Sequence, residues 1–203
     1  MTLALIDYGA GNLRSVENAL RAAGGTDISV TADPEFVRKA DRVVLPGVGA
    51  FGACMGALSA IPGMVEALNE SVRGAGQPFL GVCVGMQLMA DAGEEFGRTP
   101  GLGWVPGVVA KLEPADPEAR VPHMGWNDVL PSTPHPLIVP GEAYFLHSFA
   151  FTASPEDAVA MTNHGGPVTA AVARANMIGV QFHPEKSQAY GLAFLKRFLD
   201  WRP

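Results

Sequence analysis

The chain has 203 residues, of which 48% are hydrophobic and 17% are charged, and its formal net charge at pH 7 is −6. That length gives one α/β domain with a sizeable core, and the composition excludes a disordered chain. The acidic balance without any basic run excludes a nucleic-acid surface, and every apolar stretch is interrupted by Gly, Pro or a charged residue short of membrane-spanning length.

Strands and helices are expected to alternate through the first half of the chain. Asn12 stands where a helix N-cap is expected, and the apolar run Phe79–Val82 is typical of a strand buried on both faces. A β-α-β-α order specifies a parallel sheet with helices on both sides. The expected strands are Leu3–Ile6, Ile28–Thr31, Arg42–Leu45 and Phe79–Val82, and the expected helices are Leu13–Ala23, Pro34–Lys39, a stretch ending at Leu58, Gly63–Arg73 and one that begins just after Cys83.

The second half changes to strands in close succession, some of them paired as hairpins, and ends in one helix. The chain contains no internal repeat and no linker. Residues 1–203 are therefore expected to form a single α/β domain with a parallel or mixed sheet flanked by helices. The expected strands are Val108–Leu112, Asn127–Leu130, Ala143–Leu146, Ala158–Asn163, Val168–Arg174 and Met177–Phe182, and the expected helix is Ser187–Trp201.

The two cysteines, Cys54 and Cys83, differ sharply in their surroundings. Cys83 lies in a Gly-Val-Cys-Val-Gly run between an apolar strand and a helix. This is the cysteine form of a nucleophile elbow, in which side chains at Gly81 and Gly85 would crowd the turn. Cys54 has no such context and is expected to be a buried, inert thiol.

A catalytic thiol needs a base, and His183 is the best-placed histidine. It follows the apolar strand Met177–Phe182, and Glu185 can lie on the same side of the extended chain. The carboxylate would fix the imidazole tautomer, while the imidazolium and the helix N-terminus would favour the Cys83 thiolate. The backbone N–H of Val84 would lie near the oxygen of a tetrahedral intermediate.

The other histidines give weaker signals. His135 lies between two prolines and is interpreted as part of a surface turn, and His164 before two glycines as a hairpin corner, whereas His123 and His147 remain candidates. No Cys or His pair has metal-ligand spacing, so we expect neither a metal nor a cofactor. With two cysteines and no charged leader before the apolar N-terminus, we expect no disulfide framework, no signal peptide and a cytoplasmic location.

These motifs resemble the class I glutamine amidotransferases. The elbow Gly-Val-Cys-Val-Gly-Met-Gln and the His-Pro-Glu at residues 183–185 carry this resemblance. Further motifs, in the family's order, narrow it to glutaminase subunits of imidazole glycerol phosphate synthases, which implies a flavodoxin-like α/β fold. The narrowing motifs are Tyr8–Asn12, Pro46–Gly49, His123–Asn127, His147-Ser148 and His183–Ser187.

The resemblance implies that Cys83 attacks the side-chain amide of glutamine to give a thioester and ammonia. His183 would transfer protons, and Glu185 would orient it. Glu95 would hold the α-amino group of the substrate, although a solvated loop acid fits that position equally well. Phe149 stands where tyrosine is expected, which matters little if contacts there come from main-chain atoms but puts any role for a hydroxyl in doubt. The expected oxyanion and substrate-binding residues are Val48, Gly49, Val84, Gln87, Glu95, His147 and Ser148.

We expect the acceptor of the ammonia to be another chain, because the glutaminase domain uses all 203 residues. The resemblance implies a heterodimer with a (β/α)8-barrel synthase subunit. That subunit would join ammonia to a phosphorylated ribulosyl nucleotide and make imidazole glycerol phosphate in histidine biosynthesis. The Gly-rich loop Pro46–Gly52 could switch its peptides, so the isolated chain is expected to be nearly inactive until the partner binds. The candidate interface residues are Asn12, His123, Trp126 and Lys186.

Two alternatives remain at this point. The chain could be an amidotransferase subunit that delivers ammonia to another pathway, such as cofactor or aminobenzoate synthesis. It could also be a non-catalytic relative in which Cys83 senses oxidants. The motifs His123–Asn127 and Lys186-Ser187 favour the histidine pathway, and His183 with Glu185 favours catalysis. Trp126 could likewise be a half-buried core residue.

Overall fold

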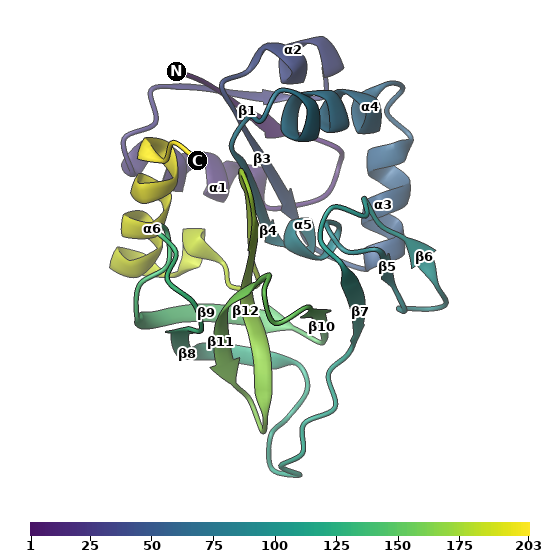
Figure 1. Cartoon of the computed structure of the whole chain (residues 1–203), viewed down its shortest axis with the longest axis vertical. Coiled ribbons are helices and arrows are strands. Elements are labelled where there is room, and N and C mark those ends of the chain that lie inside the picture. Colours follow the sequence, from purple (N-terminus) through teal and green to yellow (C-terminus); the bar gives the residue numbers. More distant parts are fainter.

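A mixed nine-stranded sheet with the strand order β2-β1-β3-β4-β13-β12-β11-β8-β9 crosses the molecule (Figure 1). The computed structural model describes all residues 1–203. The strands β2, β1, β3, β4 and β13 run parallel to one another, and β12, β11, β8 and β9 are each antiparallel to the strand before them in this order. The strands are β1 (Thr2–Ile6), β2 (Asp27–Thr31), β3 (Arg42–Gly47), β4 (Phe79–Cys83), β8 (His123–Pro131), β9 (Gly141–His147), β11 (Ala158–Asn163), β12 (Pro167–Arg174) and β13 (Met177–Val180).

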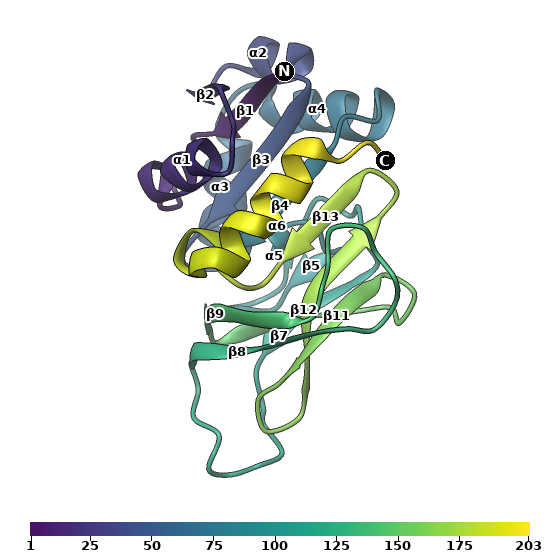
Figure 2. The same cartoon turned by 90° about the vertical axis from the view of Figure 1, so that its left-hand side faces the viewer.

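The helices cover both faces of the parallel half of the sheet. Because the chain moves in one direction from β1 to β2 and in the other from β2 to β3, right-handed crossovers place the first helix opposite the next ones. Figures 1 and 2 show α1 and α6 together on one face, and α3 and α4 on the other. The helices are α1 (Leu13–Ala22), α2 (Pro34–Lys39), α3 (Phe51–Ser59), α4 (Met64–Leu68) with a π-helical continuation Asn69–Gly74, α5 (Val84–Gln87) and α6 (Gln188–Asp200).

The ends of the elements follow local chemistry. Asn12 caps α1 as expected, because its side-chain oxygen accepts a hydrogen bond from the Ser15 N–H at 3.4 Å. No single helix is long and apolar enough to cross a membrane; only the pair Phe51–Ser59 and Met64–Gly74 passes on length and composition, and that pair is bent by 96°.

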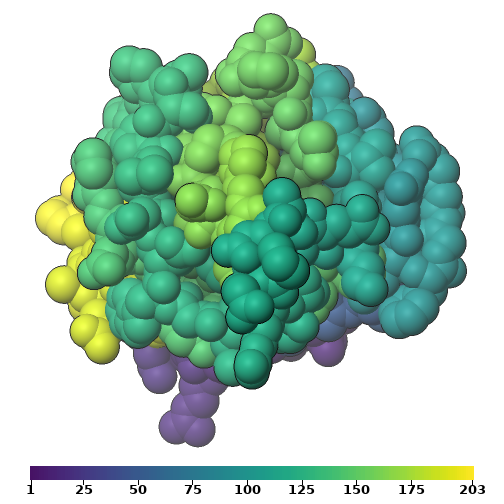
Figure 3. Space-filling model, turned by 90° about the horizontal axis from the view of Figure 1, so that it is seen from below, coloured from purple at the N-terminus to yellow at the C-terminus, as the bar shows by residue number.

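A second, four-stranded sheet has the order β10-β7-β5-β6 and was only partly foreseen. Its strand β7 (Gly107–Lys111) matches an expected strand, whereas β5 (Ala92–Gly93), β6 (Thr99–Pro100) and β10 (Phe149–Ala153) were not expected. The loop from β7 to β8 extends furthest from the helices, and Figure 3 shows that residues of the second half form most of this lower face.

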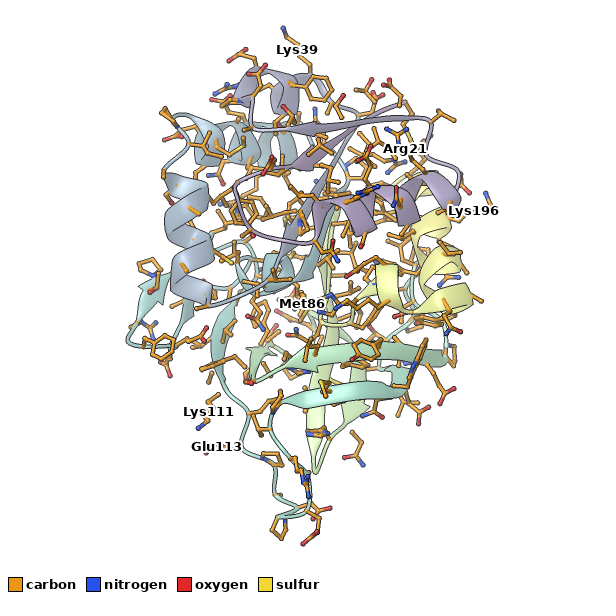
Figure 4. All side chains as sticks on the ribbon, turned by 180° about the vertical axis from the view of Figure 1, so that it is seen from behind. Arg21, Lys39, Met86, Lys111, Glu113 and Lys196 are labelled. Atoms are coloured by element: carbon orange, nitrogen blue, oxygen red, sulfur yellow. The ribbon has the colours of Figure 1, made fainter.

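The parallel strands bring the predicted motifs together at their carboxyl ends. Gly47 at the end of β3 pairs with Cys83 at the end of β4, and Val82 pairs with Val180 on β13. The order β2-β1-β3-β4-β13 is the flavodoxin-like order, in which ligands bind at the carboxyl edge of the strands. Figure 4 places Met86 of α5, directly after this edge, near the centre of the molecule.

Candidate active site

Cys83 lies at a sharp turn from β4 into α5. Its φ of 55° and ψ of −111° are unfavourable for a residue with a side chain, and such backbone strain is typical of functional turns. The flanking glycines make the turn possible: a Cβ on Gly81 would lie 2.6 Å from the Gly85 carbonyl oxygen, and one on Gly85 would lie 1.9 Å from the Leu45 oxygen. The expected elbow is therefore confirmed, although α5 has only four residues.

His183 and Glu185 form a buried pair next to Cys83. The Nδ1 atom of His183 lies 2.9 Å from Oε1 of Glu185, and the side chains are only 3% and 2% exposed. The extended chain at His183 and the short 3₁₀ turn Pro184–Lys186 hold the two residues together. With Nδ1 engaged by the carboxylate, Nε2 is the ring atom available to the thiol.

The charge state of His183 is set by its partners. Burial alone lowers the pKa of His183, but hydrogen bonds and charge interactions with Cys83 and Glu185 outweigh it and raise the pKa to about 10. A protonated imidazole at neutral pH favours a thiolate at Cys83 and is ready to donate a proton.

One cavity of about 320 Å³ contains nearly all of the expected catalytic and binding residues, a volume within the range of small-molecule sites. Glu185 lies behind His183 and outside the cavity lining. The lining comprises Val48, Gly49, Cys83, Val84, Gln87, Glu95, Pro122, Leu146, His147, Ser148, Phe149, His183 and Lys186.

Gln87 is held in one orientation by two acceptors. Its Nε2 donates hydrogen bonds to the main-chain oxygen of Phe149 and to Oε1 of Gln181, each at 3.0 Å. Because both amide protons are used, Gln87 presents only its Oε1 to the cavity. The contact at Phe149 comes from the main chain, so the absence of a tyrosine hydroxyl does not affect it.

His147 and His123 form a chain of hydrogen bonds that reaches the same carbonyl. His147 Nδ1 donates to the Phe149 oxygen at 2.9 Å, which leaves Nε2 to accept from His123 Nδ1 at 3.0 Å. His123 Nε2 in turn accepts from Asn127 Nδ2 at 3.0 Å. Burial, reinforced by His147 and His164, lowers the pKa of His123 to about 3, and burial chiefly lowers that of His147 to about 4.

The Pro46–Gly49 segment is tethered at both ends. The Tyr8 hydroxyl donates to the Pro46 oxygen at 2.7 Å, and the Cys54 thiol donates to the Val48 oxygen at 3.4 Å. Only the peptide between Gly47 and Val48 has neither of these restraints. Cys54 is buried, as expected, but its thiol hydrogen-bonds a segment that lines the cavity.

Glu95 is half-buried at the cavity and is not a free loop acid. Its Oε2 accepts a hydrogen bond from the N–H of Phe51 at 2.8 Å, at the N-terminus of α3. A carboxylate at a helix N-terminus is favourable, and the remaining oxygen is the group that could meet an ammonium in the cavity.

The candidate interface residues divide into two groups. Trp126, at 47% exposed, lies edge-on to Tyr144, and the Lys186 ammonium lies 5.8 Å from the centre of the same ring. Asn12 is exposed as well. His123 differs, because its side chain is 3% exposed and is directed toward His147.

Three further polar residues are His164, His135 and Gln181. His164 lies at the β11–β12 corner, as expected, and its ring stacks on His123 at 4.1 Å. His135 forms a bridge with Ile138 in a turn, also as expected, but is half-buried against Trp201. Gln181 was not foreseen as a site residue, yet its position two residues before His183 on an extended chain is the signal that could have identified it.

A larger cavity of about 670 Å³ lies elsewhere, next to β7, β10 and β12. It contains neither Cys83 nor His183, and its lining is mainly small and apolar. Lys111 and Glu113 at its edge point away from the body of the molecule (Figure 4). The reactive groups therefore assign the site to the smaller cavity.

Comparison with known proteins agrees with this geometry. The family model described as glutamine amidotransferase class-I matches residues 4–200. The imidazole glycerol phosphate synthase subunit HisH of Zymomonas mobilis is 63% identical over the whole chain and 97% of that relative. The subunit of the same name from Caulobacter vibrioides is 58% identical over the whole chain and 99% of that relative.

Solved structures show the same fold at much lower identity. A crystal structure of a glutamine amidotransferase has a TM-score of 0.76 and 16% identity, covering 98% of each chain. The structure of PurLQS from Thermotoga maritima has a TM-score of 0.72 and 17% identity, covering 98% of this chain and 95% of that one. These likenesses extend to the fold alone.

Proposed function

The chain belongs to the class I glutamine amidotransferase family, and we propose that it is the glutaminase subunit of an imidazole glycerol phosphate synthase. It hydrolyses glutamine to glutamate and ammonia, and the ammonia serves a synthase step of histidine biosynthesis. The observation that carries this proposal is the buried His183–Glu185 pair beside the strained elbow of Cys83, with Cys83 and His183 lining one cavity. The relatives named HisH favour this pathway over another ammonia-dependent one.

The geometry supports a two-step reaction. The Cys83 thiolate attacks the side-chain carbonyl carbon of glutamine, and the oxygen that becomes negative is stabilised by the Val84 N–H and an N–H of the Val48-Gly49 segment. The His183 imidazolium gives its proton to the leaving nitrogen, so ammonia departs and a thioester remains. Neutral His183 then removes a proton from water, which attacks the thioester and releases glutamate and the thiol.

The other lining residues bind the amino acid. Oε1 of Gln87 accepts a hydrogen bond from the side-chain amide of glutamine, and the free carboxylate oxygen of Glu95 accepts one from the α-ammonium group. His147 and Ser148 also line the cavity. Residues 1–203 act as one glutaminase domain.

The ammonia acceptor is a (β/α)8-barrel synthase subunit in a heterodimer. Trp126 and Lys186 support a docking surface near the cavity, because an exposed aromatic ring and an ammonium both lie next to Tyr144. The tethered Pro46–Gly49 segment supports gating, since rotation of its one unrestrained peptide would present or withdraw an N–H donor.

The test measures glutamine hydrolysis by the purified chain alone, with the barrel subunit, and with that subunit and its nucleotide ligand. We expect very low activity alone and a rise of about a hundredfold or more in the full mixture, as one oxyanion donor contributes a factor of this order. Cys83→Ala should abolish hydrolysis in the mixture and leave partner binding unchanged. Hydrolysis retained by Cys83→Ala would refute the nucleophile, and full activity of the chain alone would refute gating.

A further inference from the structure

Gln181 is a fully buried polar side chain next to the reactive sulfur, and the two-step reaction gives it no role. It follows the last residue of β13 and precedes Phe182 and His183. Its Nε2 lies 3.6 Å from Sγ of Cys83, and its Oε1 accepts the hydrogen bond from Gln87. The side chain therefore connects the nucleophile to a residue that lines the substrate cavity.

The orientation of the Gln181 amide follows from a backbone group. The carbonyl oxygen of Phe149 can only accept, so the Gln87 group that faces it must be the amide nitrogen. That nitrogen also faces Gln181, which must therefore offer its oxygen to Gln87. The nitrogen of Gln181 is consequently directed at Cys83, as a donor toward the sulfur.

The groups around the sulfur have opposing effects. The main-chain oxygen of Leu146 lies 3.9 Å from Sγ and accepts a hydrogen bond from the thiol, so it favours the protonated form. A donor favours the thiolate. The four residues of α5 align few peptide dipoles at the Cys83 end. Side chains that donate to the sulfur, the Gln181 amide as well as the His183 imidazolium, therefore stabilise the thiolate.

We propose that Gln181 is a catalytic hydrogen-bond donor that stabilises the Cys83 thiolate and holds the sulfur aimed into the cavity. This rests on the proposed role of Cys83 as the nucleophile. Hydrogen bonds from the Phe149 carbonyl through Gln87 hold the Gln181 donor in place. Gln87, which is proposed to bind the substrate, and Gln181, which contacts the sulfur, are therefore both oriented by the Phe149 carbonyl.

The experiment compares the wild type with Gln181→Met, which keeps the shape of the side chain and removes the donor. Alkylation of Cys83 by iodoacetamide is followed by mass spectrometry of its peptide from about pH 5 to about pH 9. We expect the pH midpoint of alkylation to rise by about one unit, as loss of a hydrogen bond to a charged group predicts. With the partner present, kcat should fall about tenfold, whereas KM should change by less than about threefold.

The other titratable groups near the Cys83 sulfur are the same in the wild type and in Gln181→Met. His183 and Glu185 follow β13, Cys54 comes from α3 and Tyr8 follows β1; His147 and Glu95 line the same cavity, as does Lys186. A difference in the alkylation midpoint between variant and wild type therefore reports the loss of the Gln181 amide and not a change in one of these groups.

Two further variants make the result decisive. Thr162→Val is the matched control, since Thr162 is buried and its Oγ1 has no hydrogen-bond partner; it should leave the alkylation midpoint unchanged. Gln181→Glu tests the same idea if Gln181→Met does not fold, because a carboxylate facing the sulfur should raise the midpoint by more than about one unit. A wild-type midpoint in a folded Gln181 variant would overturn the proposal, whatever its activity, whereas hydrolysis by Cys83→Ala would overturn the proposed function instead.

Discussion

His183 and His147 are both buried imidazoles at one cavity, yet their pKa values move in opposite directions. Hydrogen bonds with a thiol and a carboxylate raise the pKa of His183, whereas His147 lies among other imidazoles and donates only to a backbone carbonyl. Burial penalises the cation in both cases, and the neighbouring charges decide the outcome. The two rings can therefore have different tasks: one transfers protons and the other stays neutral and orders hydrogen bonds.

Neutral His123 and His147 predict that the protein loses stability in mild acid. Both are neutral in the folded state below about pH 6.5, where the same side chains are protonated in the unfolded chain. The unfolded state then binds more protons, so the free energy of unfolding falls as pH drops from about 6.5 toward about 4. Each histidine contributes roughly 1.4 kcal/mol per pH unit. His183, with its raised pKa, is protonated in both states there and adds no slope.

Urea unfolding at several pH values across that range measures this slope. His123→Gln removes one of the two groups and should reduce the slope by roughly 1.4 kcal/mol per pH unit. A slope unchanged by the substitution would show that His123 is already protonated in the folded protein.

At the scale of elements, α5 packs very closely against β3. A Cβ at Gly85 would lie 1.9 Å from the Leu45 oxygen, which belongs to a central strand that cannot retreat. Gly85→Ala should therefore destabilise the protein by about 3 kcal/mol or more. Gly56→Ala on the exposed side of α3 is the control: nothing lies within 4 Å of its Cβ, and it should stabilise by about 0.5–1 kcal/mol. Thermal unfolding measures the change in stability of both variants, and equal melting temperatures for Gly85→Ala and Gly56→Ala would contradict the prediction.

The first half of the fold was predictable because its elements obey local rules. Each strand from β1 to β4 was located within one or two residues, since buried parallel strands are short apolar runs between turn residues. The strand expected at Met177–Phe182 ends at Val180, because the chain leaves the sheet to bring Gln181 and His183 toward Cys83. Only one residue, Ser148, lies between the end of β9 and the start of β10, so no turn signal separates these strands in the sequence.

The pairing of His183 with Glu185 was predictable from their spacing, and the wider hydrogen-bond network was not. Glu185 lies two residues from His183, so local geometry suffices to pair them. The bonds between Gln87 and Gln181, and between His123 and His147, join residues 94 and 24 positions apart. Such pairs depend on which strands lie side by side, and the rules for connections leave several strand orders open.

At the scale of the whole molecule, two exposed apolar side chains of β8 lie toward the same end as the reactive groups. The carboxyl ends of the parallel strands hold the cavity, and Met124 and Trp126 on β8 are 65% and 47% exposed. β8 and β9 lie beyond the parallel strands, at the opposite edge of the sheet from β2 (Figure 2). Apolar exposure beside a reaction site is typical of a surface that a partner covers.

Trp126→Ala should weaken binding of the barrel subunit by about 30-fold or more, as expected for a tryptophan at an interface hot spot. Val30→Ala on the far edge strand β2 is the control, because Val30 is 40% exposed and lies away from the cavity; it should bind as the wild type does. Isothermal titration calorimetry with the barrel subunit measures both affinities. Equal affinities would place the interface elsewhere.

The fixed amide of Gln87 also bears on how the enzyme treats its own product. With both of its protons committed to Phe149 and Gln181, Gln87 offers the cavity an acceptor and no donor. The amide of glutamine can satisfy that acceptor, but the carboxylate of glutamate has no proton to give and meets oxygen with oxygen. In the proposed binding mode, the contact that recognises the substrate therefore repels the product, so we expect glutamate to leave readily and to inhibit weakly even when it accumulates.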